Sequence, residues 1–521
     1  MAKKSWLAIG SGIAALLCTA TSGGVAAGEP ADAPITARCS GLEGKSFAGA
    51  VVTSASHVAA GTALPPFQRT FAPGFCRVKA ATAPGASSEI KFEIWLPDDW
   101  NGKFVGVGGG GFEGSYQQAN LVLRRPVGAG YAAIATNAGH DVSSAPKWAL
   151  GQPERIADFG YRANHLGALF GKAVVAGYYG TEASRSIFHG CSNGGRDALM
   201  LAQRYPADYD AIAVGAPAND FSGLMASFAR LRQMTQAAAG SPGFMDKLKL
   251  VRTAAIAQCD RLDGAADGII GNPASCRFDP AVLACKAGAS GEGCLMAPEV
   301  AAVRVLYSPV QLGSGALVMP GLPPGSEYQW EAWLLGKTAA GPGMATNFYR
   351  YFIHGNPDWD PARFDLDSDW RAGRASVSPA IDALDPDLSP FLKRGGKLLI
   401  YHGWDDAAIP AGNTLRYDAA MRRAVGPKLA ASTRLFMLPG VAHCAGGEAP
   451  DTIDYIGAVD RWSESGKAPD RLTATQFDNP IAALMGEPAK QVRTRPACAW
   501  PKSARYSGKG PVGEASSWVC R

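Results

Sequence analysis

The feature that most constrains the fold is a serine flanked by glycines between a strand-like run and a helix-like run. Ser192 is the centre of Gly190-Cys191-Ser192-Asn193-Gly194, which fits G-x-S-x-G. Alone the pattern is weak evidence, because a chain with 63 glycines contains about half a match by chance. Its context adds to it, since residues 185–189 are typical of a strand and 195–204 of a helix. The competing interpretation is a plain glycine turn.

Strand-like and helix-like segments alternate along much of the chain. Besides the run before Ser192, strands are predicted at residues 90–96, 103–107, 131–136, 397–401 and 434–438, and a helix at 161–179. Such alternation is typical of a parallel sheet covered by helices on both faces. The expected fold class is therefore α/β.

The middle of the chain has a different composition. A chain of 521 residues is too long for a single compact core. Residues 219–389 are rich in Gly, Pro and Ala, contain four cysteines and carry irregular aromatic clusters. We expect residues 28–218 and 390–521 to form one α/β domain, with residues 219–389 inserted into it as a lid.

A serine hydroxyl needs a base and an orienting acid to become a nucleophile. His443 follows the predicted strand 434–438, and Asp406 follows the strand 397–401. The order Ser, Asp, His is that of the α/β-hydrolases, with the lid inserted before the acid. Asp405 is the rival acid, and His402 is a rival base that more plausibly packs at the end of its strand.

The first residues resemble an export signal. Lys3 and Lys4 precede an apolar stretch that is too short for a confident membrane span, and Val25-Ala26-Ala27 suits cleavage by a signal peptidase. We expect residues 1–27 to be a signal peptide and the mature protein to be secreted or periplasmic, without a stable membrane anchor. The formal charge of +5 and the absence of a Lys/Arg block argue against a nucleic-acid partner.

Ten cysteines remain once Cys18 leaves with the signal, an even number that suits disulfides in an exported protein. Close spacing suggests the pairs Cys259–Cys276, Cys285–Cys294 and Cys498–Cys520. Cys191 directly precedes Ser192, and Cys444 directly follows His443. A Cys191–Cys444 bridge would clamp the serine turn to the histidine loop. Unrelated buried thiols are the alternative.

These motifs resemble the tannase and feruloyl esterase family, which also includes a terephthalate monoester hydrolase. The resemblance extends from about Cys39 to Cys520. It is carried by residues 108–111, 190–196, 401–403 with Asp406, and 439–447. It implies the bridges Cys39–Cys76, Cys191–Cys444, Cys259–Cys276, Cys285–Cys294 and Cys498–Cys520.

An acyl transfer needs backbone N–H groups to stabilise the oxyanion. Asn193, the residue after the serine, is one expected donor, and the run Gly108 to Gly111 suits the second, although glycine runs are often only flexible turns. The resemblance points to Gly111.

Acidic side chains also repeat in a glycine-bent loop of the lid. Asp260, Asp263 and Asp267 suit a hard cation, although a solvated acidic loop is the alternative. The resemblance implies structural calcium, bound by these aspartates and the carbonyls of Ala265 and Ile269. No organic cofactor is expected.

The resemblance implies an exported serine carboxylesterase that acts on small aromatic esters, hydroxycinnamic esters first and gallate esters next, with plant cell walls as an expected source. Trp333 and Phe348 of the lid would stack on the aromatic acyl group. Terephthalate monoesters are a further alternative, but Ile409 stands where that enzyme has an aromatic residue and Gly110 where it has serine. Its lid arginine has no clear counterpart, with Arg350 and Lys337 as possible substitutes.

Two other classes of function remain open. A catalytically inactive hydrolase-fold binding protein usually lacks a triad member, and none is missing here. A calcium-dependent carbohydrate-binding module explains the acidic loop, but not the cysteines beside Ser192 and His443.

Overall fold

The computed structural model describes residues 34–65, 68–142, 145–288 and 291–521, so the predicted signal peptide and Cys18 lie outside the described residues. A ten-stranded sheet forms the centre, in the order β1-β2-β5-β6-β8-β7-β9-β10-β13-β14. Its strands are β1 (Ser46–Phe47), β2 (Ala50–Val58), β5 (Phe75–Thr82), β6 (Ile90–Pro97), β7 (Lys103–Val107), β8 (Ala132–Thr136), β9 (Arg185–Cys191), β10 (Ala211–Gly215), β13 (Lys397–Gly403) and β14 (Thr433–Leu438).

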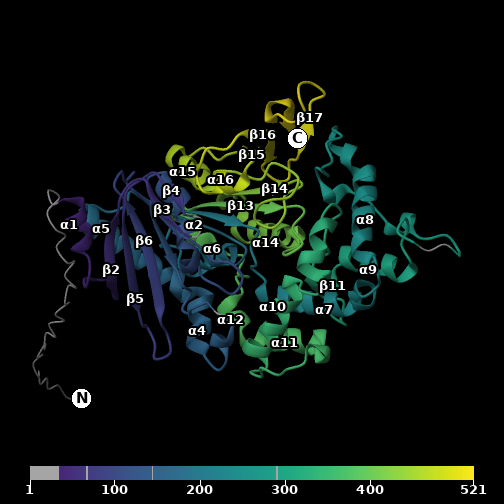
Figure 1. Cartoon of the computed structure of the whole chain (residues 1–521), viewed down its shortest axis with the longest axis horizontal. Coiled ribbons are helices and arrows are strands. Elements are labelled where there is room, and N and C mark those ends of the chain that lie inside the picture. Colours follow the sequence, from purple (N-terminus) through teal and green to yellow (C-terminus); the bar gives the residue numbers. More distant parts are fainter. Residues whose placement is uncertain (1–33, 66–67, 143–144, 289–290) are drawn as a thin grey trace, which may run out of the picture.

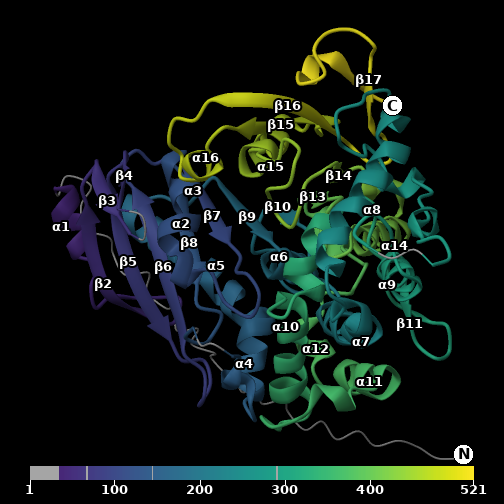
Figure 2. The ribbon, with the colours of Figure 1, turned by 45° about the vertical axis from the view of Figure 1, so that its right-hand side comes forward.

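The sheet is mixed, which corrects the expectation of a wholly parallel one. Neighbouring strands from β8 to β14 pair in parallel, whereas β1, β2, β5, β6 and β8 pair antiparallel in turn. Helical crossovers are needed only between parallel strands, so the alternating sequence pattern predicts the parallel part alone. In Figures 1 and 2 the antiparallel strands form the purple end of the molecule.

Helices cover both faces of the sheet. Side chains alternate along each strand, and in β13 Leu398 and Ile400 face one core while Leu399 and Tyr401 face another. The first core includes α5 (Ala163–Tyr179), α6 (Asn193–Arg204), α13 (Ser389–Lys393) and α14 (Ala411–Ala430). The second includes α2 (Ala119–Val122), α3 (Arg124–Gly128) and α15 (Tyr455–Ser465). The expected α/β fold is confirmed, with hydrophobic strands covered on both sides.

The chain leaves the sheet after β10 and returns at β13, and the predicted lid 219–389 falls within this excursion. The excursion has its own hydrophobic core. Its elements are α7 (Phe221–Ala239), α8 (Phe244–Cys259), α9 (Ala297–Tyr307), β11 (Val310–Gln311), β12 (Leu317–Met319), α10 (Ala340–Phe348), α11 (Leu366–Ser376) and α12 (Ser378–Ile381). These teal and green helices lie together beside the parallel end of the sheet (Figures 1 and 2).

Smaller elements complete the fold. The hairpin of β15 (Arg471–Phe477) and β16 (Gln491–Cys498) lies across the yellow end of the molecule in Figure 2. The remaining elements are α1 (Ile35–Ser40), β3 (Thr62–Leu64), β4 (Arg69–Phe71), α4 (Pro153–Ala157), α16 (Pro480–Leu484), β17 (Ala504–Tyr506) and β18 (Trp518–Cys520).

Candidate active site

Ser192 occupies a strained turn between β9 and α6. Its backbone has φ +64° and ψ −123°, a conformation that residues other than glycine rarely adopt. A Cβ added to Gly190 would lie 2.4 Å from the carbonyl oxygen of Gly194, and one added to Gly194 would lie 2.8 Å from that of Gly109. Both glycines of the motif are therefore required by close backbone contacts, and Ser192 is at the expected strand-to-helix turn.

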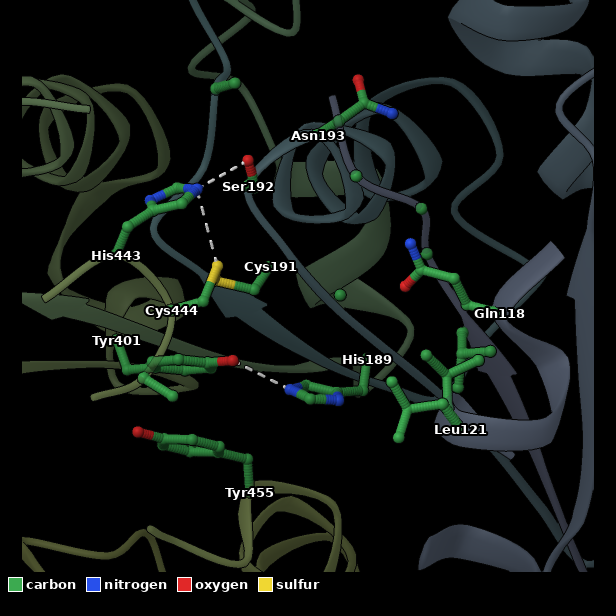
Figure 3. Close-up of a pocket in the computed structure, with 18 of the residues that line it drawn as sticks. Gln118, Leu121, His189, Cys191, Ser192, Asn193, Tyr401, His443, Cys444 and Tyr455 are labelled. Carbon is green, nitrogen blue, oxygen red and sulfur yellow. Dashed lines mark hydrogen bonds between the residues drawn. A yellow bond between two sulfur atoms is a disulfide. The ribbon is translucent and has the colours of Figure 1, made fainter. Parts of the chain in front are cut away.

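Ser192, His443 and Asp406 form one hydrogen-bonded chain. Ser192 Oγ lies 2.9 Å from His443 Nε2 (Figure 3). His443 Nδ1 lies 2.7 Å from Asp406 Oδ2. With its Nδ1–H donated to the carboxylate, the imidazole presents Nε2 as the acceptor of the serine proton. The three side chains come from loops at the ends of β9, β13 and β14.

Asp406 is fully buried and is held as a carboxylate. Burial by itself would raise the pKa of Asp406, but the charge of His443 and hydrogen bonds from His402 and His443 outweigh it and lower the pKa below its ordinary value. Its Oδ1 also accepts the N–H groups of Ala408 and Ile409, each at 2.8 Å.

Neither rival residue takes the position predicted for the base or the acid: His402 contacts Asp406 but not Ser192. His402 is buried at the end of its strand, with Nδ1 2.8 Å from Thr414 Oγ1 and Nε2 2.9 Å from the Ile409 carbonyl oxygen. Asp405 is buried near Glu327 and Tyr328 of the lid segment, and the carboxylate bonded to His443 is that of Asp406.

The described residues contain five disulfides, with the expected pairing: Cys39–Cys76, Cys191–Cys444, Cys259–Cys276, Cys285–Cys294 and Cys498–Cys520. The Cys191–Cys444 bridge joins the β9 end to the loop after β14, across 253 residues. Cys444 Sγ lies 3.8 Å from His443 Nε2. The clamp between serine turn and histidine loop is therefore confirmed as a structural feature.

Two backbone N–H groups face the space beside Ser192. Asn193 is the first residue of α6, where a helical N–H has no intrahelical acceptor. In the glycine run, the N–H of Gly108 bonds to His189 and that of Gly110 to Glu113, while the N–H of Gly109 lies 3.4 Å from Asp197. Gly111 has φ +59°, and its N–H is the one of the run without such a bond in the described chain.

A cavity of about 1010 Å³ contains Ser192 and His443. Gly110, Gly111, Asn193, Trp333 and Ile409 line it, as expected. The sequence did not single out the other apolar residues that reach the cavity from the start of the lid segment and from α10: Phe221, Leu224, Phe228 and Met344.

Phe348 is a correction to the predicted substrate-binding set. Its side chain is fully buried and packs against Phe221 and Phe352 in the lid core, so it does not line this cavity. Neither Arg350 nor Lys337 lines it. Trp333 instead stands edge-on to His443, with ring centroids 5.2 Å apart. The helical spacing of Phe221, Leu224 and Phe228 is a usable signal, but every residue from Phe221 to Phe228 is buried, so this part of α7 has no polar face that would identify the side toward the cavity.

The acidic loop of the lid contacts a basic side chain. The guanidinium of Arg495 bonds to the carboxylates of Asp263 and Asp267, while Asp260 accepts the backbone N–H groups of Asp267 and Gly268. Ala265 and Ile269 donate their own N–H groups to Asp263 and Asp267. Across the described residues, no group of three or more His, Cys, Asp or Glu side chains is arranged to hold a metal ion.

Comparison with known proteins identifies the relatives of this chain. Residues 76–521 match the model of the family described as tannase and feruloyl esterase. The chain belongs to the tannase and feruloyl esterase family. An uncharacterized esterase of Xanthomonas campestris is 34% identical over 94% of this chain and 92% of its own length. A probable feruloyl esterase B-2 of Aspergillus terreus is 33% identical over 85% of this chain and 86% of its own length.

Solved structures of the family agree with this fold. Feruloyl esterase B from Aspergillus oryzae superposes with a TM-score of 0.85 at 29% identity, covering 94% of this chain and all of that one. The tannin acyl hydrolase of Aspergillus niger shares the fold, with a TM-score of 0.72 at 21% identity, covering 91% of this chain and 92% of that one. As a member of this family, the protein is a carboxylic ester hydrolase. Among the described residues, none of the helices combines the length and apolarity needed to cross a bilayer.

Proposed function

We propose that the protein hydrolyses esters of hydroxycinnamic-type acids, with Ser192, His443 and Asp406 as its catalytic triad. The observation that carries this proposal is the continuous hydrogen-bonded chain from Ser192 Oγ to Asp406, which opens into the apolar part of the cavity. His443 takes the serine proton as Oγ attacks the ester carbonyl, and then gives it to the leaving alcohol. Water releases the acid by the same route.

The oxyanion of each tetrahedral intermediate would be stabilised by the N–H groups of Gly111 and Asn193. Such donors stabilise charge that develops only in the transition state, so they accelerate the chemical step rather than binding. Gly110 and Gly111 leave open space around their Cα atoms, which lets the ester approach this backbone closely.

The apolar residues of the cavity wall favour a hydroxycinnamoyl group over a galloyl group. Phe221, Leu224, Phe228, Met344 and Ile409 offer no side-chain hydrogen-bonding groups, and they line one side of the cavity. Three ring hydroxyls of a gallate would lose water there without gaining partners, at about 1–3 kcal/mol each. A methoxylated ring with one hydroxyl suits these walls better, which agrees with the names of the feruloyl esterase relatives. A terephthalate monoester would bring a carboxylate to this apolar side.

The proposal is tested by the Ser192→Ala variant with a panel of methyl ferulate, methyl caffeate, methyl gallate and a terephthalate monoester. We expect the wild type to give its highest kcat/KM with the two hydroxycinnamates. The variant should lose about a millionfold in kcat, the usual cost of removing a triad serine. Turnover that survives in Ser192→Ala rejects the triad, and ligand binding by a wild type without any turnover favours a binding protein.

We also propose that the acidic loop binds structural calcium through Asp260, Asp263, Asp267 and the carbonyls of Ala265 and Ile269. Two of the three carboxylates, those of Asp263 and Asp267, bond to the guanidinium of Arg495. Three aspartates and one arginine leave a net negative charge that matches a divalent cation. Asp260 is buried and has no ion pair within the described residues. Calcium prefers such oxygen ligands, although the side chains must rotate to converge on one ion. The ion would hold this loop and take no part in the chemistry.

Chelation tests the calcium proposal. We expect EDTA to lower the melting temperature and Ca²⁺ to restore it, because a ligand that binds only the folded state stabilises it. In Asp260→Asn both responses should be weakened, whereas activity below the melting transition should stay near that of the wild type. A melting temperature that changes neither with EDTA nor with millimolar Ca²⁺ would contradict the proposal.

Export is proposed on similar grounds. Five disulfides suit an oxidising compartment, and the sequence of residues 1–27 suits a cleaved signal.

A further inference from the structure

The cavity that contains Ser192 continues past the Cys191–Cys444 disulfide. In Figure 3 the disulfide lies between the Ser192–His443 pair on one side and His189, Tyr401 and Tyr455 on the other. We call the space on this second side the rear chamber. Leu121, His189, Tyr401 and Tyr455 line it (Figure 3). Arg125 and Asp454 also line the cavity, and both are close enough to His189 for their charges to act on it.

The position of the disulfide relates the rear chamber to the leaving alcohol. His443 Nε2 must reach the alcohol oxygen to protonate it, so that oxygen lies close to Nε2 when the ester bond breaks. Nε2 is also 3.8 Å from Cys444 Sγ. The alcohol half of the ester therefore begins beside the disulfide. If the acyl half lies among the apolar lid residues, the rear chamber is the part of the cavity left for the alcohol.

The walls of the rear chamber are ordered by their own contacts. The rings of Tyr401 and Tyr455 stack with centroids 3.6 Å apart, and His189 Nε2 lies 2.9 Å from the Tyr401 hydroxyl. Leu121 and Arg125 are four residues apart across α2 and α3, a spacing that suits one helical face. Tyr455 is 7% exposed, and its hydroxyl has no hydrogen-bond partner in the described structure.

The carboxylates near the rear chamber have hydrogen-bond partners, whereas the guanidinium of its arginine has none in the described structure. Asp451 accepts the Gly446 N–H at 2.6 Å, and Asp454 accepts the Gly457 N–H at 3.0 Å. Arg125 is the one Lys or Arg among the cavity-lining residues, and no side-chain hydrogen bond or ion pair of its guanidinium occurs in the part of the chain that the structure describes. Burial and then the charge of Arg125 lower the pKa of His189 to about 4, so His189 is neutral at neutral pH. The free charged donor is therefore Arg125.

We propose that the rear chamber binds the alcohol half of the ester and that Arg125 selects alcohols that carry a carboxylate. A guanidinium matches a carboxylate with two parallel hydrogen bonds, which a neutral alcohol cannot reproduce. The natural substrates would then be aromatic acyl esters of hydroxy acids. This inference rests on the proposed function, because it places the ester at Ser192.

A length series of substrates tests the inference. Feruloyl esters of ω-hydroxy acids, from hydroxyacetate up to hydroxyhexanoate, are each compared with the uncharged carboxamide of the same length. In the wild type, kcat/KM for the acid should exceed that for its amide at the length that reaches Arg125. In Arg125→Gln this ratio should fall by about ten- to hundredfold, the worth of hydrogen bonds to a charged group. Arg125→Lys should keep part of the preference.

A matched control is Arg423→Gln, which removes an exposed arginine of α14 that does not line the cavity and should keep the wild-type ratio. The inference is overturned if the acid-to-amide ratio is the same in wild type and Arg125→Gln at every length. Inhibition of p-nitrophenyl butyrate hydrolysis by the free hydroxy acids reports on Arg125 without a feruloyl group. Inhibition that weakens in Arg125→Gln, with no turnover of methyl ferulate, would reject the acyl preference but support the rear chamber.

Discussion

Two adjacent carboxyl groups show how strongly local contacts decide protonation at the residue scale. Asp405 and Asp406 are both buried. Asp406 faces two histidines and accepts two backbone N–H groups, which together hold its pKa low. Asp405 has no such set of donors. Burial, followed by the nearby carboxyl of Glu327, raises the pKa of Asp405 to about 7. The triad acid is thus charged at neutral pH, while its neighbour is close to half protonated.

This contrast predicts a stabilising effect of Asp405→Asn that depends on pH. The raised pKa of Asp405 means that wild-type stability falls as pH rises from about 4 to about 7, because the unfolded chain loses that proton first. The asparagine never ionises. Above about pH 7 the variant should be more stable by on the order of 4 kcal/mol, and below about pH 4 the difference should vanish. Urea unfolding of both proteins between about pH 4 and pH 7 and above measures this difference in stability.

Glu327→Gln serves as the control for this interpretation. Removing the neighbouring negative charge should lower the pKa of Asp405. The loss of stability with rising pH should therefore end at a lower pH in Glu327→Gln than in the wild type. A stability difference between wild type and Asp405→Asn that stays constant with pH would contradict the assignment of this titration to Asp405.

At the scale of elements, the site depends on neighbouring strand ends. β9, β10, β13 and β14 are adjacent in the sheet, so the loops after β9, β13 and β14 open at the same edge. Ser192 and Cys444 both have positive φ, +64° and +65°, although neither is glycine. The disulfide joins these two strained loops and fixes the distance between the serine turn and the histidine.

Removing the Cys191–Cys444 bridge should lower kcat more than removing another disulfide does. In the chain-entropy account, a bridge that spans 253 residues stabilises the fold by up to about 5 kcal/mol. We expect Cys191→Ala/Cys444→Ala to lower the melting temperature and to reduce kcat by about a hundredfold, as a small displacement of His443 can do. The Cys285–Cys294 bridge closes a loop of 9 residues in the lid, and its removal in Cys285→Ala/Cys294→Ala should leave kcat unchanged. Equal kcat for the two double variants would contradict the clamp.

The elements differ in how well sequence predicts them. The strand predicted at 103–107 coincides with β7, and that at 434–438 lies within β14, because these runs are apolar and flanked by turns. The pattern did not single out β10, since Ala211–Gly215 is a short apolar run that suits either a helix or a strand. The antiparallel strands β2 and β5 were also not predicted, because no helix separates them. Their pairing depends on contacts distant in sequence.

At the scale of the whole molecule, the meeting of Ser192, His443 and Asp406 was predictable, whereas only part of the cavity wall was. Ser192, Asp406 and His443 stand in local motifs, so their positions follow from strand, turn and helix signals. Phe221 and Phe348 are both aromatic and lie in the same lid core, yet only Phe221 reaches the cavity. Which face of a buried helix meets a cavity depends on how whole helices pack, and the sequence of one helix does not encode it. That Arg125 is exposed and lines the cavity likewise depends on how its helix packs, and not on its local sequence.

A buried charge cluster lies where the chain crosses between the lid segment and the α/β domain. Arg374 of α11 donates to Asp220 and to Asp382, each at 2.7 Å. Asp220 lies where the chain enters the lid segment, and Asp382 lies where it leaves. The Ala383 N–H also bonds to the Asn219 carbonyl oxygen at 2.8 Å. One guanidinium therefore holds both crossings of the lid segment together.

Removing Arg374 should loosen the lid. In Arg374→Met two buried carboxylates lose their shared cation, a change that costs about 3–5 kcal/mol in buried networks. Arg416, 3.3 Å from Asp220, offsets part of this loss. We expect the variant to have a lower free energy of unfolding than the wild type. Its KM should be higher because lid residues line the cavity. The difference in stability should shrink at low pH, where one of the two carboxylates takes up a proton. Arg371→Met removes an exposed pair with Asp367 and should cost under about 0.5 kcal/mol. Equal stability and KM in the two variants would show that the cluster does not hold the lid.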